Sequence, residues 1–135
     1  MRCLVLVIAF AAVVLPATAS ADPLPANEHF DNYFLTPSGK TVCEYSSVSG
    51  HYHVACAVGG GYGSTSYGVR PRGKAYKQTI TGDLGEIPYL APKARYGVTY
   101  HHHGITCRIR ETRGIRCVNR SRHGFRVSVE RHRRF

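Results

Sequence analysis

Acidic residues are scarce in this chain: 8 aspartates and glutamates stand against 18 lysines and arginines. They are scattered along the sequence, so no two carboxylates are placed as a general acid and base pair. The chain also has no Gly-x-Ser-x-Gly, the context of a serine hydrolase nucleophile, and no Cys-x-x-Cys spacing for a metal. These absences argue against serine hydrolases, enzymes with paired carboxylates and Cys-x-x-Cys metal sites.

Long apolar runs are also missing, apart from the 13 residues Cys3–Leu15. That run is shorter than the about 20 apolar residues that a membrane span needs. A basic residue precedes it and the small residues Ala19-Ser20-Ala21 follow it, which is the pattern of a secretory signal peptide. We therefore expect residues 1–21 to be a cleaved signal peptide, and the mature chain of 114 residues to be secreted or extracytoplasmic.

The mature chain keeps four cysteines, which we expect to form disulfides: Cys43, Cys56, Cys107 and Cys117. A two-residue loop at Ser49-Gly50 would place the first two opposite each other in a β-hairpin. A three-residue loop near Thr112 would do the same for the last two. Four cysteines allow three connectivities. Hairpin geometry favours a bridge within each hairpin, while bridges that cross between the hairpins stay open.

Alternating side chains predict strands. Tyr45 and Val54 share a face with the first cysteine pair, and Ile105, Ile109 and Ile115 share one with the second. Apolar and polar residues also alternate over 96–100 and 125–130. The glycine-rich stretch 59–73 and the proline-containing stretch 87–92 are expected to be loops or irregular edges.

Helical spacing of apolar residues is absent from the mature chain, so the fold class is all-β. We expect a small disulfide-stapled antiparallel sheet or sandwich built on two β-hairpins. Residues 34–135 form a single secreted domain in this interpretation, and residues 22–33 are an N-terminal extension. The sequence carries no signal for the oligomeric state.

Four motifs resemble a known family. They are Phe34-x-x-Pro37-Ser38-Gly39 before Cys43, Gly104-Ile105-Thr106-Cys107, Gly114-x-x-Cys117-x-Asn119, and His123-Gly124-Phe125 running to Phe135. In this order they are similar to small secreted actinobacterial proteins catalogued as a domain of unknown function. Typical members carry a further cysteine pair and a tryptophan in the middle segment, and this chain has neither. The resemblance implies a secreted β-domain and brings no established activity or catalytic residue.

Positive charge is concentrated in the second half of the chain. Residues 70–135 hold 16 basic and four acidic residues, a net charge of +12, whereas residues 22–69 hold one lysine and four acidic residues. Such a field attracts anionic polymers, in a way that depends on salt.

The reverse face of the second hairpin is the candidate anion-binding site, with Arg108, Arg110, Arg116 and Arg120. The hairpin register places Arg108 opposite Arg116, and like charges that face each other across strands are destabilising. We therefore expect either a bound anion or nearby partners such as Glu111, Glu130 or a tyrosine. The alternative is that these arginines form only a solvated basic surface without a ligand.

For a secreted protein the favoured partner is an anionic envelope polymer, a membrane or cell-wall surface, or a host glycan, ahead of nucleic acid. These features predict a binding module without enzymatic activity. The alternative is a small extracellular hydrolase, nuclease-like, in which histidines act as general acid and base beside a lysine. Its candidate residues are His51, His53, His123 and Lys74.

A metal site is the weakest candidate. On a strand His101 and His103 share a face, as do His51 and His53, and the two pairs would build a zinc or copper site if their strands met. Nothing in the sequence shows that these two strands lie next to each other. We predict no metal and no cofactor.

Overall fold

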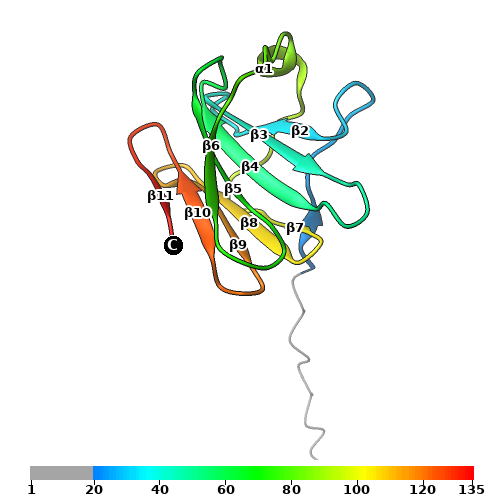
Figure 1. Ribbon diagram of the computed structural model, residues 1–135. Helices are drawn as coiled ribbons and strands as arrows, with labels where there is room; N and C mark the ends of the chain where they lie inside the picture. The colour runs from blue at the N-terminus through cyan, green and yellow to red at the C-terminus, as the bar shows by residue number, and fades with distance from the viewer. Residues whose placement is uncertain (1–19) are drawn as a thin grey trace, which may run out of the picture.

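The computed structural model describes residues 20–135 and has two β-sheets (Figure 1). The first sheet has the strand order β2-β3-β4-β5-β6 and the second β1-β7-β8-β9-β10-β11. The strands of the first are β2 Tyr33–Leu35, β3 Thr41–Ser46, β4 His53–Val58, β5 Thr65–Val69 and β6 Tyr76–Thr79. Those of the second are β1 Asp22–Pro23, β7 Thr99–His102, β8 Ile105–Arg110, β9 Gly114–Asn119, β10 Gly124–Val127 and β11 His132–Arg134.

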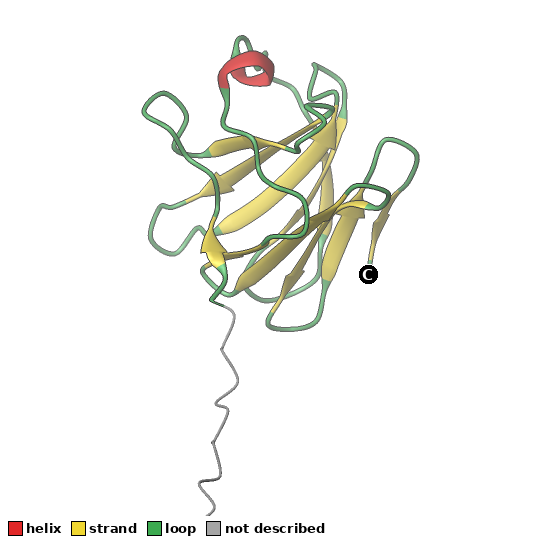
Figure 2. Cartoon of the chain, turned by 180° about the vertical axis from the view of Figure 1, so that it is seen from behind, coloured by secondary structure: helices red, strands yellow, loops and turns green. Residues whose placement is uncertain are grey.

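Strands make up nearly all the regular structure (Figure 2), so the all-β prediction is confirmed. The one helical turn among the described residues is α1, Ile87–Leu90, within the stretch that the sequence predicted as loop. Proline suits the first turn of a helix, where its missing N–H costs nothing, and Pro88 occupies that position.

The two disulfides join Cys43 to Cys56 and Cys107 to Cys117, each within one hairpin, so the favoured pairing is confirmed. The cysteines of each pair lie directly opposite each other, with Cα atoms 4.1 Å apart. This close spacing is typical of non-hydrogen-bonded positions in antiparallel strands. Disulfides are consistent with an extracellular location.

The predicted turns are present in both hairpins. In the first, the N–H of His51 bonds to the carbonyl of Val48 across Ser49-Gly50, but strand pairing ends earlier, at Ser46 and His53. Arg110 pairs with Gly114, which leaves a three-residue loop around Thr112. Gly114 has a φ of +67°, and a Cβ there would lie 2.1 Å from the carbonyl oxygen of Val127. Only glycine meets both conditions, so this residue lets β9 begin close against β10.

The core lies between the two sheets and is built from matching cross-strand rows. In the first sheet the inner row is Phe34, Cys43, Cys56, Tyr67 and Lys77. In the second it is Tyr100, Cys107, Cys117, Phe125 and Arg134. Strands β2–β6 and β7–β11 are therefore two five-stranded meanders with the same order of aromatic, cysteine, cysteine, aromatic and basic residues. Except for Tyr67, which is partly buried, and the two basic residues, every member is buried in one hydrophobic cluster.

The prediction that residues 59–73 form loops or irregular edges is wrong for Thr65–Val69, which is β5 and pairs with a strand on each side. The sequence did not predict this strand because Gly68 has no side chain that could contribute to an alternating pattern. A Cβ on Gly68 would lie 2.4 Å from Cζ of Tyr76 on the neighbouring strand β6. Glycine in a strand often marks such a close approach, and here it admits the tyrosine ring.

Both ends of the described chain take part in the fold. Residues 22–33, predicted as an extension, contribute the parallel strand β1 and the buried Leu24. Strand β11, which the sequence did not indicate, is the outermost strand of the second sheet. The predicted signal peptide falls outside the described residues except for residues 20 and 21.

Candidate anion-binding site

Four arginines form a continuous row across four neighbouring strands of the second sheet. Arg108 pairs with Arg116, Arg116 with Arg126, and Arg126 with Arg133. Adjacent strands are about 4.8 Å apart, so three steps give the row a length on the order of 14 Å. Because the sequence neighbours of these arginines, such as Cys107, point into the core, the arginines point outward. We call Arg108, Arg116, Arg126 and Arg133 the arginine row.

Two further arginines lie next to the row. Arg110 and Arg113 line a hollow of about 390 Å³ together with Arg108, Arg116 and Arg126. Thr99, Thr106, Gly114 and Val118 complete its lining. We call the row together with Arg110 and Arg113 the arginine face. No acidic residue lines the hollow.

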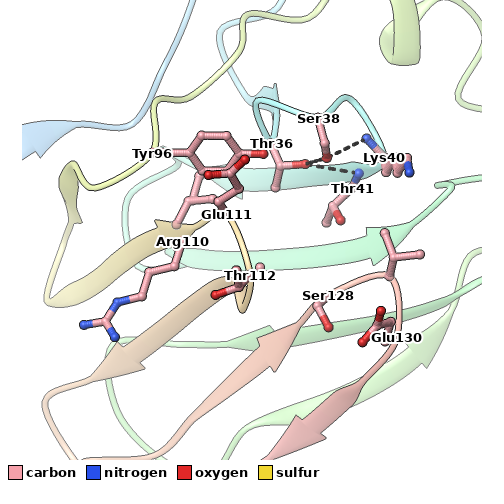
Figure 3. A pocket seen from close by; sticks show the side chains of 13 residues that line it. Thr36, Ser38, Lys40, Thr41, Tyr96, Arg110, Glu111, Thr112, Ser128 and Glu130 are labelled. Atoms are coloured by element: carbon pink, nitrogen blue, oxygen red, sulfur yellow. Dashed lines mark hydrogen bonds between the residues drawn. The ribbon is translucent and has the colours of Figure 1, made fainter.

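The expected acidic partners do not neutralise these arginines. Within residues 20–135 the ion pairs are His29–Glu28, His53–Glu44 and Arg95–Asp22, and none involves the arginine face. Glu111 and Glu130 instead line a neighbouring hollow of about 460 Å³ with Lys40 and Tyr96. Figure 3 shows the Arg110 side chain extending away from Glu111 and Tyr96. Arg110 also lines this neighbouring hollow. Among the described residues, no arginine of the face forms an ion pair with an acidic group.

The aromatic partner of the face is the last residue of the chain, and not a tyrosine. The ring of Phe135 lies 4.7 Å from the guanidinium of Arg116 and 5.9 Å from that of Arg133. Its backbone N–H and C=O both bond to Gly124, at 2.9 Å each, which fixes the ring beside the row. Exposed cation–π contacts contribute about 0.5–1 kcal/mol each. They orient the two guanidiniums without using their N–H donors.

Arg126, in the middle of the face, is the most constrained of these arginines. It is partly buried, and its Nε is a buried donor without a hydrogen-bond partner among the described residues. Burial lowers the pKa of Arg126, and the neighbouring charges of Arg133 and Arg116 lower it further. Leaving such a donor unpaired costs roughly 1–3 kcal/mol. An anion on the row would satisfy this donor and offset the repulsion.

Arg120, which the sequence grouped with the other three, lies elsewhere. It follows the end of β9, and its Nε would contact a Cβ placed on Gly104, in the turn between β7 and β8. It does not line the hollow of the arginine face. The sequence missed Arg113, Arg126 and Arg133. Alternation within β10 does place Arg126 outward, but the register that sets it beside Arg116 depends on the turn before β10.

The histidines of the β7–β8 turn contact the end of the β3–β4 hairpin. Nε2 of the buried His102 lies 2.6 Å from the carbonyl oxygen of Ser46, and the ring of His103 stacks on Tyr52 with centroids 3.6 Å apart. Burial lowers the pKa of His102. A hydrogen bond to Glu44 raises the pKa of His53.

These contacts keep the candidate metal ligands engaged with protein groups. Nδ1 of His53 lies 3.4 Å from the carbonyl oxygen of His51, and Nε2 of His101 accepts the N–H of Gly104. In the part of the chain that the structure describes, no group of three or more histidine, cysteine or acidic side chains could hold a metal ion. Of the four histidines that the sequence proposed, the rings of His53 and His101 lie within hydrogen-bond distance of backbone groups and that of His103 stacks on Tyr52.

Comparison of the chain with protein-family models, with curated proteins and with solved structures gives no match. From residue 20 onward the structure has no helix of the length and hydropathy needed to cross a bilayer. The resemblance to the actinobacterial family stays a prediction, and the function is argued from the residues themselves.

Proposed function

We propose that this protein is a secreted binding module, without enzymatic activity, whose arginine face holds an anionic polymer of an envelope or host surface. The observation that carries the proposal is the arginine row, which has one guanidinium on each of four adjacent strands and no acidic residue against it. Like charges in direct register reduce stability. Guanidinium groups bind phosphate and carboxylate groups through paired N–H donors, which would offset that cost.

The direction of the row indicates how a polymer would lie. The row crosses the strands at right angles, so a linear chain with regularly spaced anions would run from β8 to β11 and meet up to four arginines. The hollow is partly open to solvent, which leaves room for a polymer segment. Phe135 is the aromatic residue beside the row, and two guanidiniums already contact its ring. Stacking platforms for nucleic-acid bases are therefore few, which favours an acidic envelope polymer over single-stranded nucleic acid.

Binding of inorganic polyphosphate and of polyuronate, followed by calorimetry over a range of salt concentrations, tests this proposal. We expect the affinity to fall as salt rises, and Arg108→Ser/Arg116→Ser to lower it by at least tenfold and to reduce the salt dependence. The matched control is Arg72→Ser/Lys93→Ser, which removes the same charge from exposed positions outside the arginine face. An affinity that does not change with salt, or an equal loss in both double variants, would overturn the proposal.

A second candidate function is a small extracellular nuclease, because the structure gathers part of the required set. His123 and Lys74 line a common hollow together with His132, whereas His51 and His53 lie at the β3–β4 hairpin. Two histidines and a lysine are the side chains that phosphodiester cleavage uses as general base, general acid and charge stabiliser. RNA and DNA zymograms of the protein and of its His123→Asn variant test this function. A cleared band that the native protein gives and the variant does not would support nuclease activity. The absence of a cleared band with the native protein would exclude it.

A further inference from the structure

A second concentration of positive charge lies at the open edge of the sandwich, between β6 and β11. The inner rows of the two sheets end there in Lys77 and Arg134, opposite Tyr67 and Phe125 respectively. Alternation places both side chains on the side of the sheet that faces the core, yet both are exposed because their strands are at the edge. The two sheets thus each direct one cation into the same opening.

A hollow of about 590 Å³ occupies this opening, and we call it the edge cleft. Its lining joins Lys77 and Arg134 to Lys74 from the loop before β6, His123 from the turn before β10 and His132 from β11. No acidic residue lines the cleft. Within residues 20–135, none of these five side chains forms an ion pair with an acidic group.

One wall of the cleft contains a contact between the two sheets. The ring of His132 stacks on that of Tyr67, with centroids 5.7 Å apart and planes inclined by 26°. This contact links the edge strand β11 to β5 of the other sheet. The rest of the cleft is widely open to solvent, so a phosphate group can reach its cationic side chains.

Charge on edge strands has a general explanation, because inward-pointing charges prevent edge strands from pairing with other chains. That explanation accounts for Lys77 and Arg134, which belong to the edges. It does not account for Lys74 and His123, which come from loops and face the same opening. Gathering cations from four segments costs electrostatic energy unless an anion shares the space.

We propose that the edge cleft is a binding site for a phosphate group, either free or at the end of a larger molecule. Arginine offers a planar fork and lysine a compact charge, and together they are the side chains that recognise phosphate oxygens. The volume of the cleft lies within the roughly 300–1,000 Å³ of small-ligand sites, so it has room for a group attached to the phosphate.

The edge cleft adjoins the arginine face, because Arg133 of the arginine row and the ring of Phe135 also line it. Arg108 and Arg116 do not line the cleft, and Lys77 and Arg134 are not members of the arginine face. Variants of these two pairs therefore change different charges, so polymer binding and phosphate binding can fail independently.

Titration of the ¹⁵N-labelled protein with inorganic phosphate tests the proposal through the amide shifts of Lys77, His123 and Arg134. We expect saturable shifts that Lys77→Ser/Arg134→Ser weakens by at least tenfold, while Arg108→Ser/Arg116→Ser leaves them unchanged. Both residues of the cleft variant are exposed, and a thermal melt checks that it folds. Shifts that do not saturate, or that both double variants weaken equally, would overturn the proposal.

A second titration, with uridine 5′-monophosphate, distinguishes the two sources of the phosphate. Tighter binding than that of inorganic phosphate, lost in the cleft variant, would support a phosphate carried by a larger molecule. Equal binding, again lost in the cleft variant, would support recognition of the phosphate group alone. Binding of the nucleotide that persists in the cleft variant would contradict the site.

Discussion

The two meanders share an inner row but differ in the outer row next to it. In β2–β6 the outer row is Tyr33, Glu44, Ala55, Gly68 and Tyr76. In β7–β11 the residues at the same positions are Thr99, Arg108, Arg116, Arg126 and Arg133. Equivalent backbone positions therefore carry tyrosines, small residues and one glutamate on one sheet, and a threonine and four arginines on the other.

The first outer row is partly covered by its own side chains. Tyr76 lies over Gly68, Ala55 is 1% exposed, and the guanidinium of Arg70 lies 5.1 Å from the centre of the Tyr76 ring. Burial raises the pKa of Tyr76. Tyr33 and Glu44 of the same row line a hollow of about 370 Å³. In the second outer row the Phe135 ring contacts two guanidiniums, and none of the four arginines forms an ion pair within the described residues. The inner rows specify the sandwich, and the outer rows distinguish a partly covered face from one with unpaired positive charge.

The largest effect is expected from removing the disulfides, which tests whether the two meanders contribute equally to stability. The cysteines of the two bridges are 13 and 10 residues apart in sequence, so loop entropy predicts a similar stabilisation from each, roughly 3 kcal/mol. We expect Cys43→Ala/Cys56→Ala and Cys107→Ala/Cys117→Ala to lower the free energy of unfolding by amounts that agree within about 1 kcal/mol. Urea unfolding measures both. A much larger loss for one pair would show that the meanders do not support the core equally.

Gly68→Ala tests the covered face. The added Cβ would lie 2.4 Å from Cζ of Tyr76, so the tyrosine ring must move away and lose its contact with Arg70. We expect a loss of about 1–2 kcal/mol, typical of overpacking at a site that can partly relax. The control is Gly61→Ala, where a Cβ would have no atom within 4 Å and φ is not positive. Equal losses in the two variants would mean that Tyr76 does not cover the sheet.

Arg126→Met tests the position on the second sheet that is equivalent to Gly68. Here we expect the substitution to raise the stability of the protein instead of lowering it. Methionine keeps the length of the side chain but removes the unpaired Nε and one charge of the row. We expect the protein to gain up to about 1 kcal/mol of stability at low salt and to bind polyphosphate more weakly. A variant that loses both stability and affinity would indicate that Arg126 is a structural residue. Thermal melts and calorimetry on the same samples distinguish these outcomes.

Much of the fold could be predicted from the cysteines, because a disulfide within a hairpin fixes the register of both strands. That register correctly placed Arg108 opposite Arg116. It could not place Arg126, because the β9–β10 register depends on a turn that Asn119 organises. The Oδ1 of Asn119 accepts the N–H groups of Ser121 and His123, and its Nδ2 bonds to the carbonyl of Gly73, far away in sequence.

The outer face of the first sheet was harder to predict, because β5 and β6 carry few apolar residues. β5 has Tyr67 and Val69 at its inward positions but only serine and glycine at its central outward positions, and β6 is mostly exposed. Their position follows from the close approach of Tyr76 to Gly68, which links two segments through space and leaves no periodic pattern. The edge cleft was missed for the same reason, since it needs the relative position of both sheets.

The smallest expected effect lies where the meanders meet, at His102 of β7 and Ser46 of β3. Burial lowers the pKa of His102 in the folded state, so the unfolded chain takes up a proton first as the pH falls through about 6.5. The stability that neutral His102 contributes is therefore complete above pH 6.5 and is lost below it. His53 acts in the opposite direction, because Glu44 raises its pKa: its contribution is complete below pH 6.5 and is lost as the pH rises through the raised value.

We expect His102→Gln to flatten the dependence of the melting temperature on pH between 6.5 and 5, and His53→Gln to flatten it above 6.5. Glutamine keeps a donor for the Ser46 carbonyl but does not titrate, so the fold is retained while the pH response changes. Melts at half-unit pH steps measure both slopes. The groups around His102 that carry or gain charge are His53, His101 and His103, all of which oppose its protonation. A steep acid slope that persists in His102→Gln would place the pH response in the other histidines, and the junction between the meanders would then be insensitive to protonation.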